Sequence, residues 1–382
     1  MILWQIKTSY GLLEEDIWYG RMSSVFEREN DNIRVLSLFS GCGGMDFGIT
    51  SAGGDIVFAN DVVENACKTL GNYFPDSDIR HSDISQILSF PDVDIVVGGY
   101  PCQSFSMAGN RKPNNDDRTN LYKHFLRVLE TVQPKYFVAE NVSGLKHLGA
   151  GSFLEQQLTA YKAAGYQVSY HMVNARAYGV PQSRKRLFII GVRNDLGQYF
   201  EFPAETHGKA TKKNPHLKPY VSHGEAIRDL PLWPEGEFYE RPHDPEGHFS
   251  WYFMSRNRKA LWDSPAYTVV ANWRHVTLHP ASPVMKLTWS NLEDGWKQRW
   301  DFSDEYEHLI VDTSRPKLEQ ARRLSWRECA RIQTFPQDFE PVGDVESKFT
   351  QIGNAVPPLL AEVLFRHLFS GAGLKKMTAN GN

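Results

Sequence analysis

A cysteine in a loop after an apolar run is the first residue whose setting suggests covalent chemistry. Cys102 lies in the segment GGYPCQSFS (98–106), after the run VDIVVGG and after a proline whose ring fixes φ. A lone cysteine is more often a buried structural residue than a reactive one. Two glycines, Pro101 and the polar pair Gln103 and Ser104 do not build a core, however. We therefore expect this loop to present the Cys102 thiol as a nucleophile.

Three charged side chains occupy similar positions beside apolar runs. Glu140 ends the run KYFVAE, where a carboxylate either caps a helix or works as an acid. In QSRKR (182–186), directly before the run RLFIIG, Arg184 and Arg186 alternate and so project to the same side of an extended segment. Their guanidinium groups are rigid forks of donors that suit a phosphate or a base carbonyl, although a solvated basic edge strand would also explain the run.

A glycine-rich turn and two acids indicate a nucleoside ligand. The segment LFSGCGGMDFG (38–48) ends a strand and opens a helix, and its glycines let the backbone approach a ligand closely. It lacks the Gly-Lys-Ser/Thr of a phosphate-binding loop. Asp61, after the next apolar run, is placed to accept hydrogen bonds from a ribose diol, and Asp83 follows a third strand. Two carboxylates beside the turn disfavour phosphates there and favour a nucleoside that carries positive charge.

The elements that must position these residues follow a regular alternation. From residue 34 onward, short apolar runs (RVLSLF, DIVFAN, VDIVVGG, KYFVAE, RLFIIG) are separated by longer mixed stretches with helical spacing. Buried parallel strands read as near-continuous apolar runs, and helices connect them. The sequence therefore predicts an α/β fold with a doubly wound, mostly parallel sheet. In such sheets ligands bind outside the carboxyl ends of the strands.

Composition and charge exclude several classes of protein. The chain has 382 residues, of which 41% are apolar and 23% are charged, so neither a disordered tail nor a collagen-like repeat fits. The net charge of −3 gives no overall positive field, so a nucleic acid would have to meet a local basic surface. The four cysteines show no zinc or disulfide spacing, and we find neither a signal peptide nor a membrane-spanning run. We expect a cytoplasmic protein without a metal or a membrane partner.

The middle of the chain has a different texture. Residues 203–318 contain many prolines and tryptophans and no alternation of strands and helices. Between residues 241 and 300 there are eight Lys or Arg against five Asp or Glu. Aromatic residues are interleaved there with the cations Arg256, Arg258, Lys259 and Arg274; they are Trp251, Tyr252, Phe253, Trp262, Tyr267 and Trp273. The mixture suits a nucleic-acid surface, but a small β-rich domain with an aromatic core would explain it equally well.

The order of these segments resembles that of the DNA (cytosine-5) methyltransferases of bacterial restriction-modification systems. The matching segments are FSGCGG, Asp61, Asp83, GGYPCQSFS, AENV, QSRKR, RRLSWRECARIQTFP (322–336) and QIGNAVPP (351–358). The resemblance covers residues 34–200 and 322–370, and the segment between them corresponds to the variable target-recognition region of that family. PCQSFS, ENV and QxRxR in this order are very specific.

The resemblance implies a role for each catalytic position. Cys102 would be the nucleophile that adds to a flipped-out cytosine, and Glu140 the acid that engages the same base. Arg186 would contact the base carbonyl, and Arg184 would help to hold the loop and a backbone phosphate. The implied activity is transfer of a methyl group to carbon 5 of cytosine in double-stranded DNA.

The resemblance also implies the methyl donor, S-adenosylmethionine, and the residues of its pocket. These would be Phe39, Gly41, Gly43, Asp61, Asp83, Leu121, Asn354 and Val356. One position departs from the family pattern: some relatives place a tryptophan against the adenine where this chain has Val62. Adenine stacking is then either weaker here or supplied by Phe39.

The domain organisation follows from the same comparison. We expect an N-terminal extension (1–33) and a catalytic and cofactor-binding domain (34–202, completed by 346–374). A smaller target-recognition domain would occupy residues 203–345, with its variable part at 203–318, and residues 375–382 would form a C-terminal tail. The protein is expected to act as a bacterial monomer, with a cognate restriction endonuclease as a possible partner on the same DNA site.

Three rival interpretations are open. A nicotinamide-dependent oxidoreductase also uses a glycine turn after a strand, but FSGCGG is not GxGxxG, and Cys102, Glu140 and the arginines would have no role. A non-catalytic DNA-reading module has no need of a cysteine and a glutamate at strand ends. The tRNA-methylating branch of the same family is the nearest rival. Its members tend to have a smaller variable region than the roughly 115 residues here, which favours duplex DNA.

Overall fold

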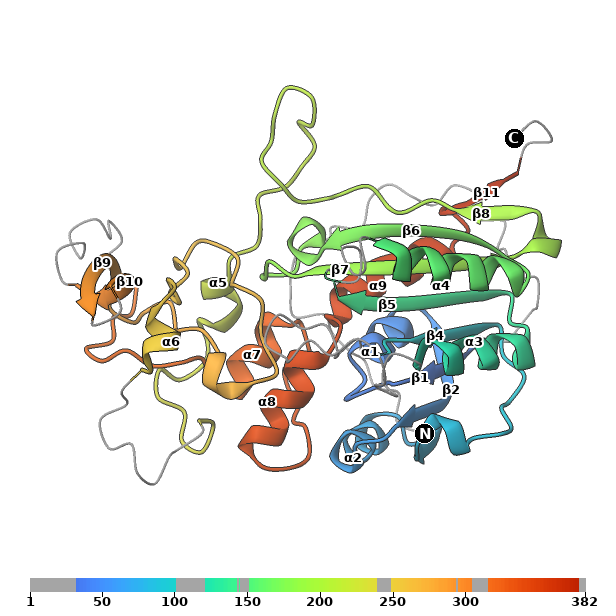
Figure 1. The fold of residues 1–382 in the computed structure, drawn as a ribbon, viewed down its shortest axis with the longest axis horizontal. Coiled ribbons are helices and arrows are strands. Elements are labelled where there is room, and N and C mark those ends of the chain that lie inside the picture. Colours follow the sequence, from blue (N-terminus) through green and yellow to red (C-terminus); the bar gives the residue numbers. More distant parts are fainter. Residues whose placement is uncertain are drawn as a thin grey trace.

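The computed structural model describes residues 32–100, 121–142, 144, 151–238, 249–292, 295–303 and 315–377. Within them, a seven-stranded sheet with helices on both sides forms the larger part of the molecule (Figure 1). Its strands are β1 (Ile33–Leu38), β2 (Gly54–Asp61), β3 (Asp78–His81), β4 (Ile95–Gly98), β5 (Tyr136–Val142), β6 (Tyr166–Asn174) and β7 (Lys185–Arg193). The helices that cover it are α1 (Gly44–Ser51), α2 (Glu64–Tyr73), α3 (Leu121–Val132), α4 (Ser152–Ala163) and α9 (Pro358–Phe369).

The strand order is β3-β2-β1-β4-β5-β7-β6. β1 to β5 are paired in parallel, whereas β7 runs antiparallel to both β5 and β6. The chain winds outward from β1 to β3 and then returns to the other side of β1 with β4, so the order reverses beside β1. All five apolar runs singled out in the sequence are strands of this sheet. The predicted doubly wound, mostly parallel sheet is confirmed.

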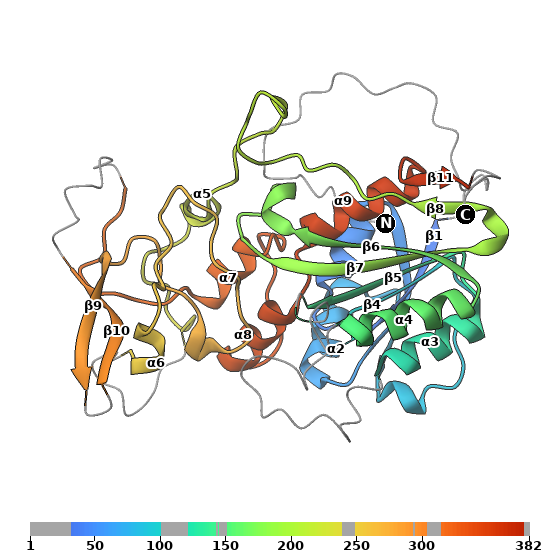
Figure 2. The ribbon, with the colours of Figure 1, turned by 45° about the horizontal axis from the view of Figure 1, so that its top comes forward.

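The alternation of side chains along the strands separates two hydrophobic layers. Val35, Val97 and Val138 face one side, where they pack with residues of α1 and α9. Their neighbours along the strands, such as Leu36 and Phe137, face the other side and pack with α3 and α4. Figure 2 shows the helices that cover the two sides of the sheet. Because both faces are covered, the strands are apolar at nearly every position, which is the pattern seen in the sequence.

Two glycines of α1 allow the C-terminal segment to lie against the turn that follows β1. A Cβ on Gly44 would lie 2.3 Å from the carbonyl oxygen of Val356, and one on Gly48 would lie 2.4 Å from that of Pro358. Only glycine therefore allows α1 to lie directly against the start of α9. This contact brings the segment QIGNAVPP beside the glycine turn that follows β1.

A second group of elements lies beyond the end of the sheet that carries this glycine turn (Figure 1). It contains α5 (His223–Ile227), α6 (Trp251–Met254), α7 (Trp326–Ile332), α8 (Val345–Asn354) and the hairpin β9 (Met285–Leu292) and β10 (Gly295–Phe302). At the opposite end, β8 (Gln198–Phe200) pairs with β11 (Leu374–Lys376). Single-turn helices are η1 (Ile84–Gln86), η5 (Ala175–Tyr178), η6 (Asn194–Leu196) and η7 (Trp273–His275). No helix in these ranges combines the length and apolarity needed to cross a bilayer.

Two further hydrophobic clusters organise this part. One joins residues from α5, η7, α7 and α8, including Trp273 and Trp326. The other is smaller and centres on Phe253 under the base of the hairpin. Phe253 and Trp273 are thus core residues, whereas Tyr252 and Tyr267 are 53% and 42% exposed, so the aromatic residues of this part are divided between core and surface.

A buried ion pair holds the segment that leads into α7. Arg322 donates from both terminal nitrogens to the carboxylate of Glu328, at 2.8 and 2.7 Å. Ser325 and Glu328 form a reciprocal capping box at the start of α7. Both charged side chains are nearly inaccessible, so loss of either would leave the other charge buried without its partner. The basic segment RRLSWREC is thus largely structural.

A buried carboxylate lies in the first turn of α1. Asp46 has no exposed surface, and the polar groups near its carboxylate, the Ser37 hydroxyl and its own amide, offset only part of the cost of burying the charge. Burial, with a smaller contribution from the Asp61 carboxylate, raises the pKa of Asp46 from 3.8 to about 7. The native protein therefore keeps this proton up to about pH 7, whereas the unfolded chain releases it near pH 4. The free energy of unfolding should fall as the pH rises between these two values and level off above them.

We expect Asp46→Asn to remove this pH dependence, because the amide is neutral throughout. The stability gained by the variant over the wild type should grow by about 2–3 kcal/mol between pH 5 and pH 8. Urea unfolding at several pH values measures this difference. Asp55→Asn, at an exposed acid of β2, is the matched control and should show no such trend. A difference that stays constant with pH would contradict the raised pKa.

Candidate active site

The carboxyl ends of three neighbouring strands form the base of the site. In the register of the sheet, Leu38 of β1 pairs with Gly98 of β4, and Gly98 pairs with Ala139 of β5. The next residue of each strand, namely Phe39, Gly99 and Glu140, therefore lies at the same edge. Parallel pairing alone brings the glycine turn, the segment that leads to Cys102 and the Glu140 carboxylate together, as the sequence predicted.

The glycine turn after β1 has an unusual backbone. Phe39, Gly41 and Gly43 all have positive φ, at 54°, 56° and 86°. A left-handed conformation costs a non-glycine residue roughly 1–2 kcal/mol, so Phe39 is held there by its surroundings. The turn is fixed by Asp61, whose two carboxylate oxygens accept hydrogen bonds from the amides of Gly41 (2.8 Å) and Val63 (2.9 Å). Burial raises the pKa of Asp61, and these bonds counteract that effect.

The two predicted acids lie on adjacent strand ends. Asn60, at the end of β2, is buried and donates to the carbonyls of Arg80 and Ser82, at 3.0 and 2.8 Å. It thereby fixes the turn that carries Asp83. The Asp83 side chain is exposed, and hydrogen bonds from Ser85 lower its pKa. In the part of the chain that is described, no group of three or more His, Cys, Asp and Glu side chains could hold a metal ion.

The other residues predicted for the cofactor pocket differ in their surroundings. Phe39 is partly buried, and its ring meets that of Tyr100 edge to face, with centroids 6.4 Å apart. Leu121, at the start of α3, is half-buried beside the same hydrophobic layer. Val356 is buried against α1, and Asn354 is exposed at the end of α8.

Glu140 and Arg186 form a buried pair. The Nε of Arg186 lies 2.9 Å from Oε1 of Glu140, and the two side chains are only 15% and 11% exposed. The pair is diagonal across antiparallel strands, because Glu140 faces Phe188 and Arg186 faces Val142. Burial raises the pKa of Glu140, while the charges of Arg186 and then Arg184 oppose that rise. The site therefore holds an acid that retains its proton more readily than an exposed glutamate.

The predicted nucleophile comes shortly after β4, the strand that pairs with the one carrying Glu140. Cys102 lies outside the described residues, and the chain enters its segment at Gly99 and Tyr100. A Cβ on Gly99 would lie 3.2 Å from Oε2 of Glu140. Asn141 donates from Nδ2 to the carbonyl of Tyr100 at 3.1 Å, so it fixes the backbone just before Pro101. Sequence reasoning missed Asn141, although it stands beside Glu140 in the run AENV.

Arg184 is fully buried. It has no exposed area, and its two terminal nitrogens donate to the carbonyls of Val269 and Gly353, both at 2.9 Å. The expected contact with a DNA phosphate does not fit this arrangement, because both bonded donors face protein backbone. Buried Gln182, which sequence reasoning did not single out, accepts from the Val269 amide at 2.8 Å. The segment QSRKR thus ties β7 to the middle region and α8.

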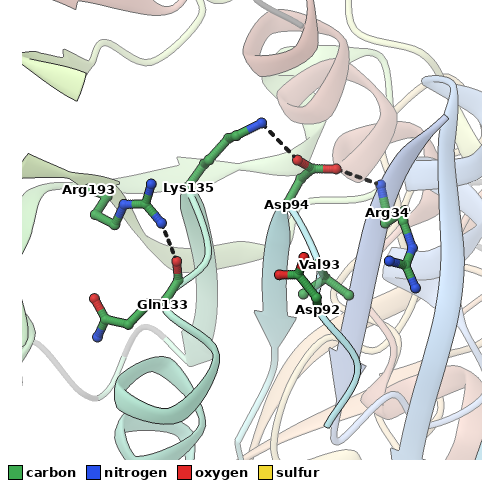
Figure 3. Close-up of a pocket in the computed structure, with 7 residues that line it drawn as sticks. All are labelled: Arg34, Asp92, Val93, Asp94, Gln133, Lys135 and Arg193. Carbon is green, nitrogen blue, oxygen red and sulfur yellow. Dashed lines mark hydrogen bonds and ion pairs between the residues drawn. The ribbon is translucent and has the colours of Figure 1, made fainter. Parts of the chain in front are cut away.

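A small cavity of about 130 Å³ lies at the opposite edge of the sheet (Figure 3). Its lining comes from residues at the amino ends of β1, β4 and β5 and from the end of β7. Asp94 accepts there from Lys135 Nζ at 3.0 Å and from the Arg34 amide at 3.1 Å. None of the predicted site residues lines this cavity, so it is not part of the candidate site.

The comparisons with known proteins agree with this geometry. The chain is 38% identical to the Type II methyltransferase M.BsuRI of Bacillus subtilis, over 87% of this chain and 78% of that protein. It is 37% identical to the Type II methyltransferase M.BspRI of Lysinibacillus sphaericus, over 89% and 82%. Among solved structures, the fold is similar to that of the methyltransferase EhMeth of Entamoeba histolytica, with a TM-score of 0.58, 16% identity and coverage of 90% and 99%. The family description of C-5 cytosine-specific DNA methylases matches residues 33–370, and the chain belongs to that family.

Proposed function

We propose that this protein is the modification methyltransferase of a Type II restriction-modification system, and that Cys102 and Glu140 act together on a cytosine of duplex DNA. The observation that carries the assignment of residues is the buried pair of Glu140 and Arg186 at the end of β5, directly beside the strand that leads to Cys102. The names of its relatives, which are 31–38% identical, favour DNA over tRNA as the substrate.

The reaction needs these residue types. Carbon 5 of cytosine is a poor nucleophile until the conjugation of the ring is broken. Addition of the Cys102 thiolate to carbon 6 forms a carbon–sulfur bond and places electron density on carbon 5, which then takes the methyl group. Loss of the proton from carbon 5 expels the Cys102 sulfur and restores the ring. A bound S-adenosylmethionine supplies the electrophilic methyl group.

Glu140 and Arg186 make the addition possible. Protonation or strong hydrogen bonding of ring nitrogen 3 by Glu140 makes carbon 6 electrophilic, so that no unaided negative charge develops. Arg186 orients the Glu140 carboxyl and has further donors for the base carbonyl. Arg184 acts as a positioning residue behind this pair. Carbon 6 is inaccessible inside a duplex, so the cytosine must first be flipped out, which costs a few kcal/mol that other DNA contacts must supply.

The chemistry of the pocket beside β1 suits S-adenosylmethionine. The strained Phe39 turn leaves the backbone open, since a Cβ on Gly41 would meet nothing within 4 Å. We assign Asp61, which follows β2 and bonds the glycine turn, to the ribose, and the exposed carboxylate of Asp83 to a ligand that carries positive charge. Val62 is 65% exposed and too small to stack on an adenine, so we assign that contact to Phe39. Leu121, Asn354 and Val356 complete the proposed pocket.

Asp61→Ala is expected to weaken S-adenosylmethionine binding at least tenfold, because the variant loses both the ribose acceptor and the hydrogen bond that holds the glycine turn at Gly41. A loss of one or two hydrogen bonds to a carboxylate, at about 1.5 kcal/mol each, corresponds to this factor. Isothermal titration calorimetry with the cofactor measures it. Affinity for duplex DNA should stay within twofold. An unchanged cofactor affinity would show that the ribose lies elsewhere.

The domain assignment belongs to the same proposal. Residues 34–202, completed by 346–374, would form the catalytic and cofactor-binding domain, and residues 203–345 the target-recognition domain. The small hydrophobic cluster around Phe253 supports a separate unit within residues 249–321. The larger cluster joins residues of α5 and α7 to Cys42 in the glycine turn, so the two parts share an extensive apolar contact.

Bisulfite sequencing of DNA from bacteria that express the chain tests the proposed function. We expect one short sequence whose cytosine is protected at nearly every occurrence in the genome. Sequencing of tRNA from the same cells tests the rival substrate. Protected cytosines in tRNA alone, or none in either nucleic acid, would contradict the proposal. Sedimentation of the free enzyme and of its DNA complex tests the expected monomer.

A further inference from the structure

The hairpin β9–β10 has two chemically different faces. In its antiparallel register, Trp289 is opposite Gln298 and Asn291 is opposite Trp296, so these four side chains share one face. The other face carries a different set of residues: Lys286, Thr288, Lys297, Arg299 and Asp301. Three of these are cations and one is an acid. The hairpin is therefore a ribbon with an aromatic and amide face, called the indole–amide face below, and a basic reverse face.

The indole–amide face is exposed. Trp296 and Trp289 are 68% and 60% accessible, and they are diagonal neighbours across the two strands. Asn291 and Gln298 are exposed as well, and among the residues described no hydrogen bond engages either amide. Two adjacent, mostly exposed indoles are not needed for the core, which takes only the base of the ribbon through Met285 and Trp300. Such a patch usually marks a binding surface.

The base of the indole–amide face continues into a group of arginines. Phe302 packs against Phe249, with ring centroids 5.7 Å apart, and Phe249 stacks on Phe253 at 4.8 Å. The guanidinium of Arg323 lies over both of these rings, at 4.8 and 4.6 Å. Close by, burial and then the charges of Arg258, Arg323 and Arg274 lower the pKa of His275. Arginines thus border the base of the ribbon, and the phosphates of a nucleic acid are a partner that they fit.

We propose that the indole–amide face of β9–β10 enters the major groove of the DNA substrate and reads its sequence. A two-stranded ribbon has the width of that groove, and side-chain amides are suited to hydrogen-bond base edges. Trp289 and Trp296 pack against thymine methyl groups and sugars, and the cations of the reverse face and of the base contact phosphates. The carboxyl end of β5, the strand that carries Glu140, points toward the part of the molecule that contains the hairpin (Figures 1 and 2). This inference rests on the proposed function.

The test compares two double variants with the wild type and with Tyr199→Ala. Tyr199 is a 39% exposed aromatic residue on β8, at the other end of the molecule. Affinities are measured by fluorescence anisotropy for a duplex that contains the methylated sequence and for a scrambled duplex. W289A/W296A should bind both duplexes at least about tenfold more weakly. N291A/Q298A should lose about tenfold in affinity for the specific duplex and keep its affinity for the scrambled one. Tyr199→Ala should match the wild type.

Thermal unfolding checks that each variant is folded, and W289Q/W296Q replaces the alanine pair if that pair is not. Unchanged affinities of both double variants, with a wild type that methylates DNA, would overturn the inference and leave the proposed function intact. A wild-type dimer that W289A/W296A dissociates without loss of DNA affinity would also overturn it, because the face would then join two copies of the chain. A wild type that methylates no DNA would refute the proposed function itself.

Discussion

Cys102→Ala is expected to lower methyl transfer to DNA by at least about 10⁴-fold, because without the thiolate nothing breaks the conjugation of the cytosine ring. The other cysteines cannot replace it: Cys42, Cys67 and Cys329 are all buried. Burial raises the pKa of Cys67 to about 11, and it also raises the pKa of Cys42 and Cys329. Incorporation of a labelled methyl group into duplex DNA measures the loss.

A duplex with 5-fluorocytosine at the target position tests the covalent step separately. Fluorine cannot leave carbon 5 as a proton does, so the adduct between sulfur and carbon 6 should persist and migrate as one species on a denaturing gel. The wild type should be trapped in the presence of S-adenosylmethionine, and Cys102→Ala should not. Cys67→Ala, which removes a different, buried cysteine from α2, is the matched control and should be trapped like the wild type. Trapping of Cys102→Ala, or its retained turnover, would refute the assignment.

The sheet could be predicted from the sequence because strands that are buried on both faces are apolar at nearly every position. Strands such as β4 and β5 are covered by helices on each side, so they appear as uninterrupted apolar runs. The strand β3 is different: it lies at the edge of the sheet, and its residues DIRH are mostly exposed. This strand could be predicted only from Asp83, the acid that follows it. The hairpin β9–β10 was not predicted, although Met285, Leu287 and Trp289 alternate with Lys286, Thr288 and Ser290; a single short alternating run is a weaker signal than the buried runs of the sheet.

The candidate site was predictable where sequence order and strand register coincide. Phe39, Gly99 and Glu140 meet because their strands are parallel neighbours, and a βα rhythm is enough to anticipate that. The contacts of Arg184 depend instead on loops far away in the sequence, and an arginine that donates to two backbone carbonyls looks like any other arginine in a basic run. Supporting amides such as Asn60 carry no charge and follow no pattern, so only the coordinates show their function.

Glu140→Gln should lower kcat by about 10²–10⁴-fold, because the amide keeps the shape of the side chain but has no acidic proton to give to ring nitrogen 3. Affinity for DNA and for S-adenosylmethionine should change little. The pH profile is the sharper measurement. Burial raises the pKa of Glu140, so the wild-type kcat should fall as the pH rises through that value and the carboxyl group ionises.

The Gln variant should lack this alkaline limb, since an amide does not titrate, and Glu155→Gln, at an exposed glutamate of α4, should keep the wild-type profile. Arg186 provides a further check on the direction. Its guanidinium lies 2.9 Å from the Glu140 carboxylate and stabilises the ionised form. In Arg186→Gln, where Glu140 is intact, the alkaline limb of the kcat profile should therefore move to higher pH, and activity should be weaker. If Glu140→Gln keeps kcat within tenfold of the wild type or retains the limb, the proton comes from another group. Glu140 would then serve only to orient Arg186 against the base.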